Sequence, residues 1–315
     1  MKRFRTIFMG TPEFSVPCLE KLAEKADVIA VVTQPDKPAG RGRRLMPPPV
    51  KVFAEEHGIP VYQPLKAKTP EFVAKLRELA PELVVVVAFG QILSQEMLDI
   101  PPFGCINVHT SLLPRYRGCA PMQAAILHGE RVTGITTMFM NAGLDTGDIL
   151  LQQEIEIGAD ETADELHDRM KDAGAVLLME TLEMLSDGTL ERQKQDDSLA
   201  SYVPMLSKEM GRIDWRRPAQ EIHNLVRGLR SWPCAYAVWD GTQIKIWRTR
   251  LSGRASEEHH PGKILGGTKQ GFLVDTGDGI LEILEMQMPG KKRMQAADYV
   301  RGHSEILQGC FEVTA

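Results

Sequence analysis

The chain has 315 residues, of which 43% are hydrophobic and 25% are charged, so its composition is that of a globular protein of about two domains. Its net charge of -5 gives no overall nucleic-acid signature, although a few basic residues on one face could still bind phosphates. Five widely spaced cysteines form no CxxC pair, and no apolar run approaches the ~18 residues of a membrane span, so we expect a cytoplasmic protein without a disulfide framework or zinc site.

The first half of the chain alternates strand-like and helix-like segments. Residues 83–89 are continuously apolar and β-branched, which is typical of a strand buried on both faces of a parallel sheet. The expected strands are residues 6–9, 28–33, 59–62, 83–89, 105–109, 134–140 and 149–157. The first expected helix ends near residue 25, and the others cover residues 50–57, 70–79, 121–128 and 162–185. This alternation predicts an open, Rossmann-like α/β sheet, parallel or mixed, with helices on both faces.

The composition changes near residue 190. Residues 191–207 are polar with weak periodicity and are interpreted as a linker between a domain of residues 1–190 and a domain of residues 208–315. The last domain holds all four tryptophans and carries 16 Lys/Arg against 13 Asp/Glu, whereas the rest of the chain carries 21 against 29. Its short expected strands are residues 235–239, 243–248, 263–265, 271–275 and 280–286, flanked by helices at residues 218–229 and 295–300. This pattern predicts a small, basic, OB-like β-barrel in which at least two tryptophans belong to the core.

Asn107 and His109 stand two positions apart at the end of one expected strand, so their side chains project from the same face and Val108 from the other. They also lie at the carboxyl end of that strand, the edge of an open α/β sheet where ligands bind. An amide can donate to a developing oxyanion, and an imidazole can move a proton or stabilise the same charge. The pair alone leaves catalysis and simple hydrogen bonding to loop backbone equally open.

A carboxylate follows the next expected strand. Asp145, in the segment Gly143–Asp148, could orient His109 and raise its basicity. The tetrapeptide Asp-Thr-Gly-Asp recurs at residues 275–278 between two expected strands, where Asp-Gly favours a hairpin turn. The tetrapeptide by itself therefore predicts only a turn. The first copy is a functional candidate only because it lies beside the strand that carries Asn107 and His109.

These residues carry a resemblance. Asn107-x-His109, followed by Ser-Leu-Leu-Pro at residues 111–114 and Gly-Leu-Asp-Thr-Gly at residues 143–147, resembles the formyltetrahydrofolate-dependent formyltransferases. The loop Gln-Pro-Asp-Lys-Pro-Ala-Gly-Arg-Gly at residues 34–42 and the stretch at residues 206–215 are similar to the branch of that family that formylates methionyl-initiator-tRNA. The resemblance covers nearly the whole chain and departs from the family's pattern at none of the three central positions.

The resemblance implies that 10-formyltetrahydrofolate is the formyl donor and that the α-amino group of methionyl-initiator-tRNA is the acceptor. Asn107 and His109 would donate to the tetrahedral oxyanion, and Asp145 would set the state of His109 and relay the amine proton. The scheme requires no metal. The folate donor would be bound by residues on two strand ends: Phe89, Gly90, Ile92, Leu93, Ser111, Leu112, Leu113 and Pro114.

Two basic segments are candidates for tRNA binding. Residues 34–49 form a long loop with five prolines, and loops longer than ~12–15 residues are usually functional or disordered. Arginine suits phosphates and can stack on bases. The expected tRNA-binding residues are Arg41, Arg43 and Arg44 in this loop and Lys291, Lys292 and Arg293 in the basic domain.

Two rival interpretations remain open. A formyltransferase acting on a small amine, such as glycinamide ribonucleotide or an amino-sugar nucleotide, would share residues 105–148 but would not need the arginine-rich loop. A non-catalytic RNA-binding protein would not need His109 or Asp145. Two self-sufficient domains favour a monomer, and the roles of Arg115 and Arg117 are undecided.

Overall fold

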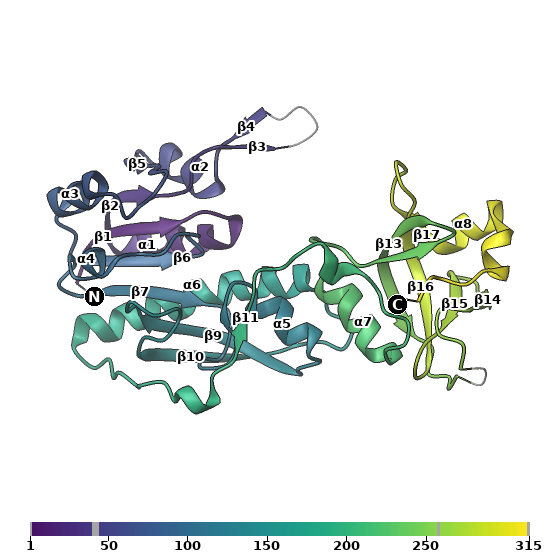
Figure 1. The fold of residues 1–315 in the computed structure, drawn as a ribbon. Helices are drawn as coiled ribbons and strands as arrows, with labels where there is room; N and C mark the ends of the chain where they lie inside the picture. The colour runs from purple at the N-terminus through teal and green to yellow at the C-terminus, as the bar shows by residue number, and fades with distance from the viewer. Residues whose placement is uncertain (1, 40–43, 257–258, 314–315) are drawn as a thin grey trace. The chain divides into compact units, whose positions relative to one another are not determined.

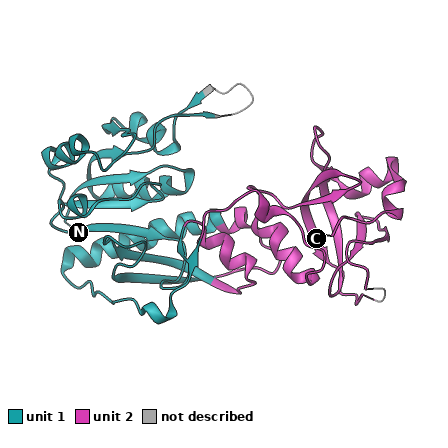
Figure 2. Cartoon of the chain, viewed as in Figure 1, with its two compact units in different colours: residues 1–118, 133–155, 167–203 teal, residues 119–132, 156–166, 204–315 magenta. Residues whose placement is uncertain are grey.

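The computed structural model describes residues 2–39, 44–256 and 259–313, which form the two compact units coloured in Figure 2. The first unit comprises residues 1–118, 133–155 and 167–203. The second unit comprises residues 119–132, 156–166 and 204–315. Two short segments from the middle of the chain thus belong to the second unit, and residues 191–203 belong to the first. The domain borders expected at residues 190 and 208 stay a prediction.

The first unit is built on a seven-stranded sheet with the strand order β10-β9-β7-β6-β1-β2-β5 (Figure 1). The strands are β1 (Arg5–Gly10), β2 (Asp27–Val32), β5 (Val61–Tyr62), β6 (Leu83–Val87), β7 (Cys105–His109), β9 (Val132–Phe139) and β10 (Ile149–Glu156). Parallel pairing joins β5 to β2, β2 to β1, β1 to β6 and β6 to β7, whereas β7 and β9 are antiparallel. All five residues of β6 are buried, as its apolar sequence predicted. The expected mixed, open α/β sheet is therefore confirmed.

The helices of this unit are α1 (Val16–Lys25), α2 (Pro49–Glu56), α3 (Pro70–Leu79), α4 (Gln95–Leu98) and most of α6 (Ala163–Asp187). Helix α6 packs on the sheet face that carries Val108, because a Cβ added to Gly174 would lie 3.3 Å from that side chain. The hydroxyls of Thr181 on α6 and Thr137 on β9 lie 2.8 Å apart on the same face. Since side chains alternate along β7, Asn107 and His109 point to the opposite face, away from α6.

Two pairs of very short strands join segments whose pairing was not expected from the sequence analysis. Strands β3 (Lys37–Ala39) and β4 (Arg44–Met46) are antiparallel within the proline-rich loop. Strands β8 (Arg117–Gly118) and β11 (Tyr202–Val203) are parallel and join the segment after β7 to the end of the first unit. Each strand has two or three residues, too few for a period to be read from the sequence.

The second unit is a curled antiparallel sheet, a half-barrel, with the order β12-β13-β16-β15-β14 and with β17 paired to β16. Its strands are β12 (Tyr236–Trp239), β13 (Thr242–Leu251), β14 (Ile264–Gly267), β15 (Phe272–Asp275), β16 (Ile280–Gln287) and β17 (Met294–Gln295), and its helices are α5 (Pro121–Leu127), α7 (Ala219–Gly228) and α8 (Ala296–Gly302). The core includes Trp215, which is fully buried and stacks on Phe311 with ring centroids 5.0 Å apart. Trp239 packs against the same core, whereas Trp232 is exposed, so two tryptophans are structural as expected.

Among the helices of the described ranges, none combines the length and the apolar character needed to cross a membrane.

Candidate active site

The carboxyl end of β7 places two polar side chains on one face of the sheet. Asn107 lies between Val86 of β6 and Met138 of β9 in the strand register and is half-buried. His109, two residues on, retains only 6% of its surface exposed. A buried imidazole and a partly accessible amide at the end of a parallel strand are placed to act on a ligand at the sheet edge.

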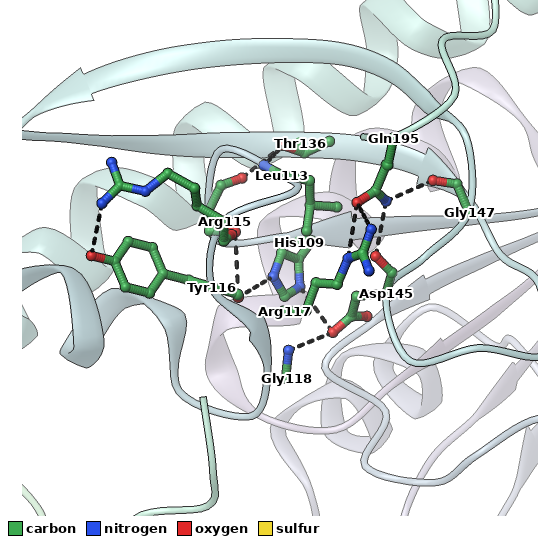
Figure 3. A network of polar contacts seen from close by, with 11 residues as sticks. His109, Leu113, Arg115, Tyr116, Arg117, Gly118, Thr136, Asp145, Gly147 and Gln195 are labelled. Carbon is green, nitrogen blue, oxygen red and sulfur yellow. Dashed lines mark hydrogen bonds and ion pairs between the residues drawn. The ribbon is translucent and has the colours of Figure 1, made fainter. Parts of the chain in front are cut away.

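The hydrogen bond of the His109 ring defines its tautomer (Figure 3). Its Nε2 lies 3.0 Å from the carbonyl oxygen of Tyr116. A carbonyl oxygen can only accept, so Nε2 carries a hydrogen and donates it. The other ring nitrogen, Nδ1, lies 3.8 Å from Oδ2 of Asp145, which is ion-pair distance and longer than a direct hydrogen bond. Nδ1 is therefore the ring atom available for proton exchange.

Asp145 lies in the loop between β9 and β10, in an uncommon backbone conformation with φ of 53°. Its Oδ2 accepts a hydrogen bond of 2.8 Å from the backbone N–H of Gly118. The loop also requires Gly147, because a Cβ there would overlap the carbonyl oxygen of Phe139. The structure thus brings His109 and Asp145 together, and the catalytic roles expected for them stay predictions.

A segment expected to be part of a linker forms one side of this site. We call residues 191–203 the strap; its Gln195 donates from Nε2 to the carbonyl oxygens of Asp145 and Gly147 at 2.8 and 2.7 Å. Its Ser201 accepts a hydrogen bond of 2.8 Å from the backbone N–H of Tyr116. These residues were not identified from the sequence, since the strap is polar and aperiodic and its partners lie far away in the chain.

The structure separates the two undecided arginines. Arg117 is 99% buried, and its guanidinium donates to Gln195, Asp197 and Tyr202 in the strap. Burial lowers the pKa of Arg117, but the hydrogen bonds to Asp197 and Tyr202 raise it, and the net shift is above the ordinary value, so the group stays charged. Arg115 is exposed and donates to the hydroxyl of Tyr116 at 3.3 Å (Figure 3).

Strand β9 holds the Ser-Leu-Leu-Pro segment, residues 111–114, in place through Thr136. The hydroxyl of Thr136 accepts from the backbone N–H of Leu113 at 3.2 Å and donates to the carbonyl oxygen of Ser111 at 2.7 Å. Leu113 is buried, whereas Leu112 and Pro114 are half-buried. This segment is therefore rigid. Its residues Leu112 and Pro114 still have apolar surface that a ligand could contact.

The other expected folate-binding segment follows β6, the strand next to β7. The carbonyl oxygen of Phe89 accepts from the Thr11 hydroxyl at 3.0 Å and from Gln34 Nε2 at 3.2 Å. Phe89 is buried in the core, and so is Leu93. Gly90 is exposed and Ile92 is 79% exposed. The two buried side chains anchor the segment, while Gly90 and Ile92 are its accessible members.

Two family descriptions match the chain: "Formyl transferase" over residues 3–182 and "Formyl transferase, C-terminal domain" over residues 205–304. The chain belongs to the formyl transferase family. It is 54% identical over 301 residues to a protein named methionyl-tRNA formyltransferase from Ruminiclostridium cellulolyticum, and the match covers 95% of this chain and 96% of the relative.

Solved structures with a similar fold are more distant in sequence. WlaRD, described as a sugar 3N-formyl transferase crystallised with dTDP and 5-N-formyl-THF, gives a TM-score of 0.66 at 19% identity and covers 93% of this chain and 100% of that one. HypX from Aquifex aeolicus, in complex with tetrahydrofolic acid, gives a TM-score of 0.65 at 16% identity over 95% of this chain. This chain covers 47% of HypX, about half its length. At these identities, the likeness supports the fold.

Among the residues expected to contact tRNA in this member of the formyl transferase family, Arg41 and Arg43 lie outside the described residues, and Arg44 begins β4. In the second unit, Lys291 and Lys292 are exposed between β16 and β17. Arg293 is paired with Glu285, and its guanidinium lies 5.1 Å from the centroid of the Trp247 ring. Lys291 and Lys292 thus present charge to solvent, whereas the charge of Arg293 is partly neutralised within the unit.

A cysteine, Cys105, lies on the same strand as Asn107 and His109 in this formyl transferase family member. Cys105 begins β7, and burial, with a smaller contribution from Asp99, raises the pKa of its thiol to about 12, so the thiolate is scarce at neutral pH. In the part of the chain that the structure describes, no group of three or more His, Cys, Asp or Glu is arranged to hold a metal ion.

Proposed function

We propose that this chain transfers the formyl group of 10-formyltetrahydrofolate to the α-amino group of methionyl-initiator-tRNA. The observation that carries the proposal is that the similarity to methionyl-tRNA formyltransferases runs through both units, at 54% identity over 95% of the chain. The sugar formyl transferase WlaRD also covers both units but is only 19% identical, so the much higher identity to methionyl-tRNA formyltransferases favours the tRNA acceptor. We place the reaction in the cytoplasm and expect the protein to act as a monomer, with catalysis in residues 1–190 and tRNA binding assisted by residues 208–315.

The chemistry follows from the side chains at the end of β7. The neutral amine attacks the formyl carbon, a C–N bond forms, and the formyl oxygen becomes an oxyanion. Asn107 donates a hydrogen bond to that oxygen, and His109 does so once Nδ1 has taken up the amine proton; such a donor is worth roughly 10²–10³ in rate in a dry site. Collapse of the intermediate breaks the bond to N10 of the folate. The proton lost by the amine passes by way of His109 and Asp145 and is returned to N10, so charge and protons balance.

The donor is bound, in this proposal, by the two strand-end segments. The half-buried Leu112 and Pro114 and the exposed Ile92 offer apolar contacts to the pterin ring, and Gly90 allows close approach of the backbone. Ser111, Leu113, Phe89 and Leu93 hold these segments in place through the contacts described above.

The test is a formylation assay with purified protein, methionine-charged initiator tRNA and 10-formyltetrahydrofolate, read as formylmethionyl-tRNA. We expect transfer that depends on the folate donor and is absent with free methionine. Glycinamide ribonucleotide and an amino-sugar nucleotide serve as competing acceptors. Faster transfer to either small amine would reverse the assignment of the acceptor, and no transfer to any acceptor would remove the enzymatic function.

We further propose that Arg41, Arg43, Arg44, Lys291, Lys292 and Arg293 contact the tRNA. Replacing Arg41 with Ala should raise KM for the charged tRNA and reduce the salt dependence of binding, because each phosphate contact releases counterions. KM for the folate donor should not change. The matched control is Lys25→Ala, which removes an exposed charge at the end of α1. Equal behaviour of the two variants would count against a tRNA contact at Arg41.

A further inference from the structure

Gln195 clamps the turn that carries Asp145. Its Nε2 donates to two carbonyl oxygens, those of Asp145 and Gly147, and its Oε1 accepts from Nε and Nη2 of Arg117 at 3.0 and 2.8 Å (Figure 3). Arginine has only donors and the carbonyls can only accept, so a single orientation of the amide satisfies all four bonds. The amide of Gln195 is therefore fixed at both ends.

Arg117 is itself immobilised. Its side chain is 1% exposed, and its remaining donors reach Asp197 Oδ1 at 2.7 Å and the Tyr202 hydroxyl at 3.0 Å. Its backbone N–H donates to the carbonyl oxygen of Ser201 at 2.8 Å. A buried guanidinium held by neutral and charged acceptors cannot move without leaving buried N–H donors unsatisfied, which costs free energy.

The backbone on either side of Arg117 contacts two of the three expected catalytic residues, His109 and Asp145. The carbonyl oxygen of Tyr116 accepts from His109 Nε2, and the N–H of Gly118 donates to the Asp145 carboxylate. Three consecutive residues therefore orient the imidazole, orient the carboxylate and, through Gln195, hold the backbone on which the carboxylate stands. That backbone has a positive φ at Asp145, an uncommon conformation, and the two hydrogen bonds from Gln195 hold the carbonyl groups of Asp145 and Gly147 in it.

We infer that Arg117 and Gln195 are positioning residues, which act through the Asp145–Gly147 turn to keep the Asp145 carboxylate at its distance from His109. The inference rests on the proposed function for the reaction that it affects. It assigns these two side chains no contact with either substrate. Their loss should therefore slow the chemical step and leave binding of donor and acceptor unchanged.

The experiment replaces Gln195 in two ways. Gln195→Met removes every hydrogen bond at nearly the same size, and Gln195→Glu keeps an acceptor for Arg117 but removes both donors to the turn. Both variants should lower kcat by roughly 10- to 100-fold, because a displacement on the order of 1 Å in a reacting group has that effect. KM for each substrate should stay at the wild-type value. The matched controls are Gln193→Met and Gln193→Glu, which alter an exposed glutamine of the same strap.

A role in folding alone predicts a different result: a lower melting temperature with wild-type kcat in the folded fraction, or equal losses from Gln193 and Gln195 variants. Either outcome overturns the inference. Arg117→Lys keeps the buried charge but cannot bridge to Gln195 with two donors, so it should reproduce the kcat loss of Gln195→Met if it folds.

Backbone amide exchange at residues 145–148 supplies a readout that does not depend on the reaction. The Gln195 variants should exchange these amides faster than the wild type, and the Gln193 variants should not. If the wild-type protein failed to formylate charged tRNA, the proposed function would fail and the amide exchange would still decide the positioning role. Unchanged exchange in Gln195→Met would then overturn that role.

Discussion

Residues 145–148 and residues 275–278 have the same sequence, Asp-Thr-Gly-Asp, but their first aspartates occupy different surroundings. Asp145 lies outside the strands, at a positive φ, with its carboxylate near His109. Asp275 is the last residue of β15 and is fully buried. Its two oxygens accept from the backbone N–H groups of His260 and Thr276 at 2.8 and 3.0 Å.

The two copies share their turn chemistry. In both, the glycine is obligatory, because a Cβ would overlap the carbonyl oxygen of Phe139 at Gly147 and that of Arg216 at Gly277. The copies differ in what the first carboxylate faces: one donor and an imidazole at Asp145, two backbone donors at Asp275. A buried carboxylate whose two oxygens both accept hydrogen bonds from the backbone is structural. A carboxylate that accepts one backbone hydrogen bond and lies beside a histidine can serve in proton transfer.

Replacing Asp145 with Asn should produce the largest effect. The amide can still accept from Gly118, but it presents no charge to His109, so kcat/KM should fall by roughly 10²–10⁴-fold, the usual value of a general acid–base group. Stability towards urea should change little, since the site retains its hydrogen bond. The measurement is the formylation rate with charged initiator tRNA, and a loss of less than about tenfold, set against that range, would remove Asp145 from the chemistry.

Replacing the glycine of each tetrapeptide with alanine should give the second largest difference in activity between the two copies. Gly147→Ala and Gly277→Ala both force backbone to move, and overpacking of this kind costs roughly 1–3 kcal/mol of stability. Only Gly147→Ala should also lower kcat, by about 10- to 100-fold, because it displaces the turn that carries Asp145. Urea denaturation and the formylation assay check the two effects separately. A kcat loss in Gly277→Ala of the same size would show that kcat reports general destabilisation.

The local parts of this architecture could be predicted from the sequence. Strand β7 and helix α3 have the ranges that their apolar periods predicted, and Thr69 caps α3 where a helix start was expected. The common face of Asn107 and His109 follows from the strand period alone. The duplicated tetrapeptide also formed the expected turn between β15 and β16.

The support of the site could not be predicted, because it depends on contacts between distant segments. Arg117 and Gln195 are 78 positions apart, and the polar strap around Gln195 has no apolar period that would reveal what it packs against. The positive φ of Asp145 is likewise a consequence of that packing. Burial of Phe89 and Leu93, which separates anchoring from accessible members of the expected folate segment, becomes visible only in the folded unit.

Replacing Asp275 with Asn gives the smallest expected effect and closes the comparison with Asp145→Asn. The amide oxygen can keep one backbone donor, but the amide nitrogen must face the other N–H, so one buried donor loses its acceptor. The expected cost is roughly 1–3 kcal/mol of unfolding free energy, the desolvation penalty of an unsatisfied buried group. In urea, the midpoint should shift downward for Asp275→Asn and hardly at all for Asp145→Asn. The folded Asp275→Asn protein should formylate charged tRNA at the wild-type rate, because its turn lies in the second unit and outside the His109 site. If instead the two aspartates lowered activity and stability in the same proportion, the distinction between a structural and a reactive copy of the same tetrapeptide would be wrong.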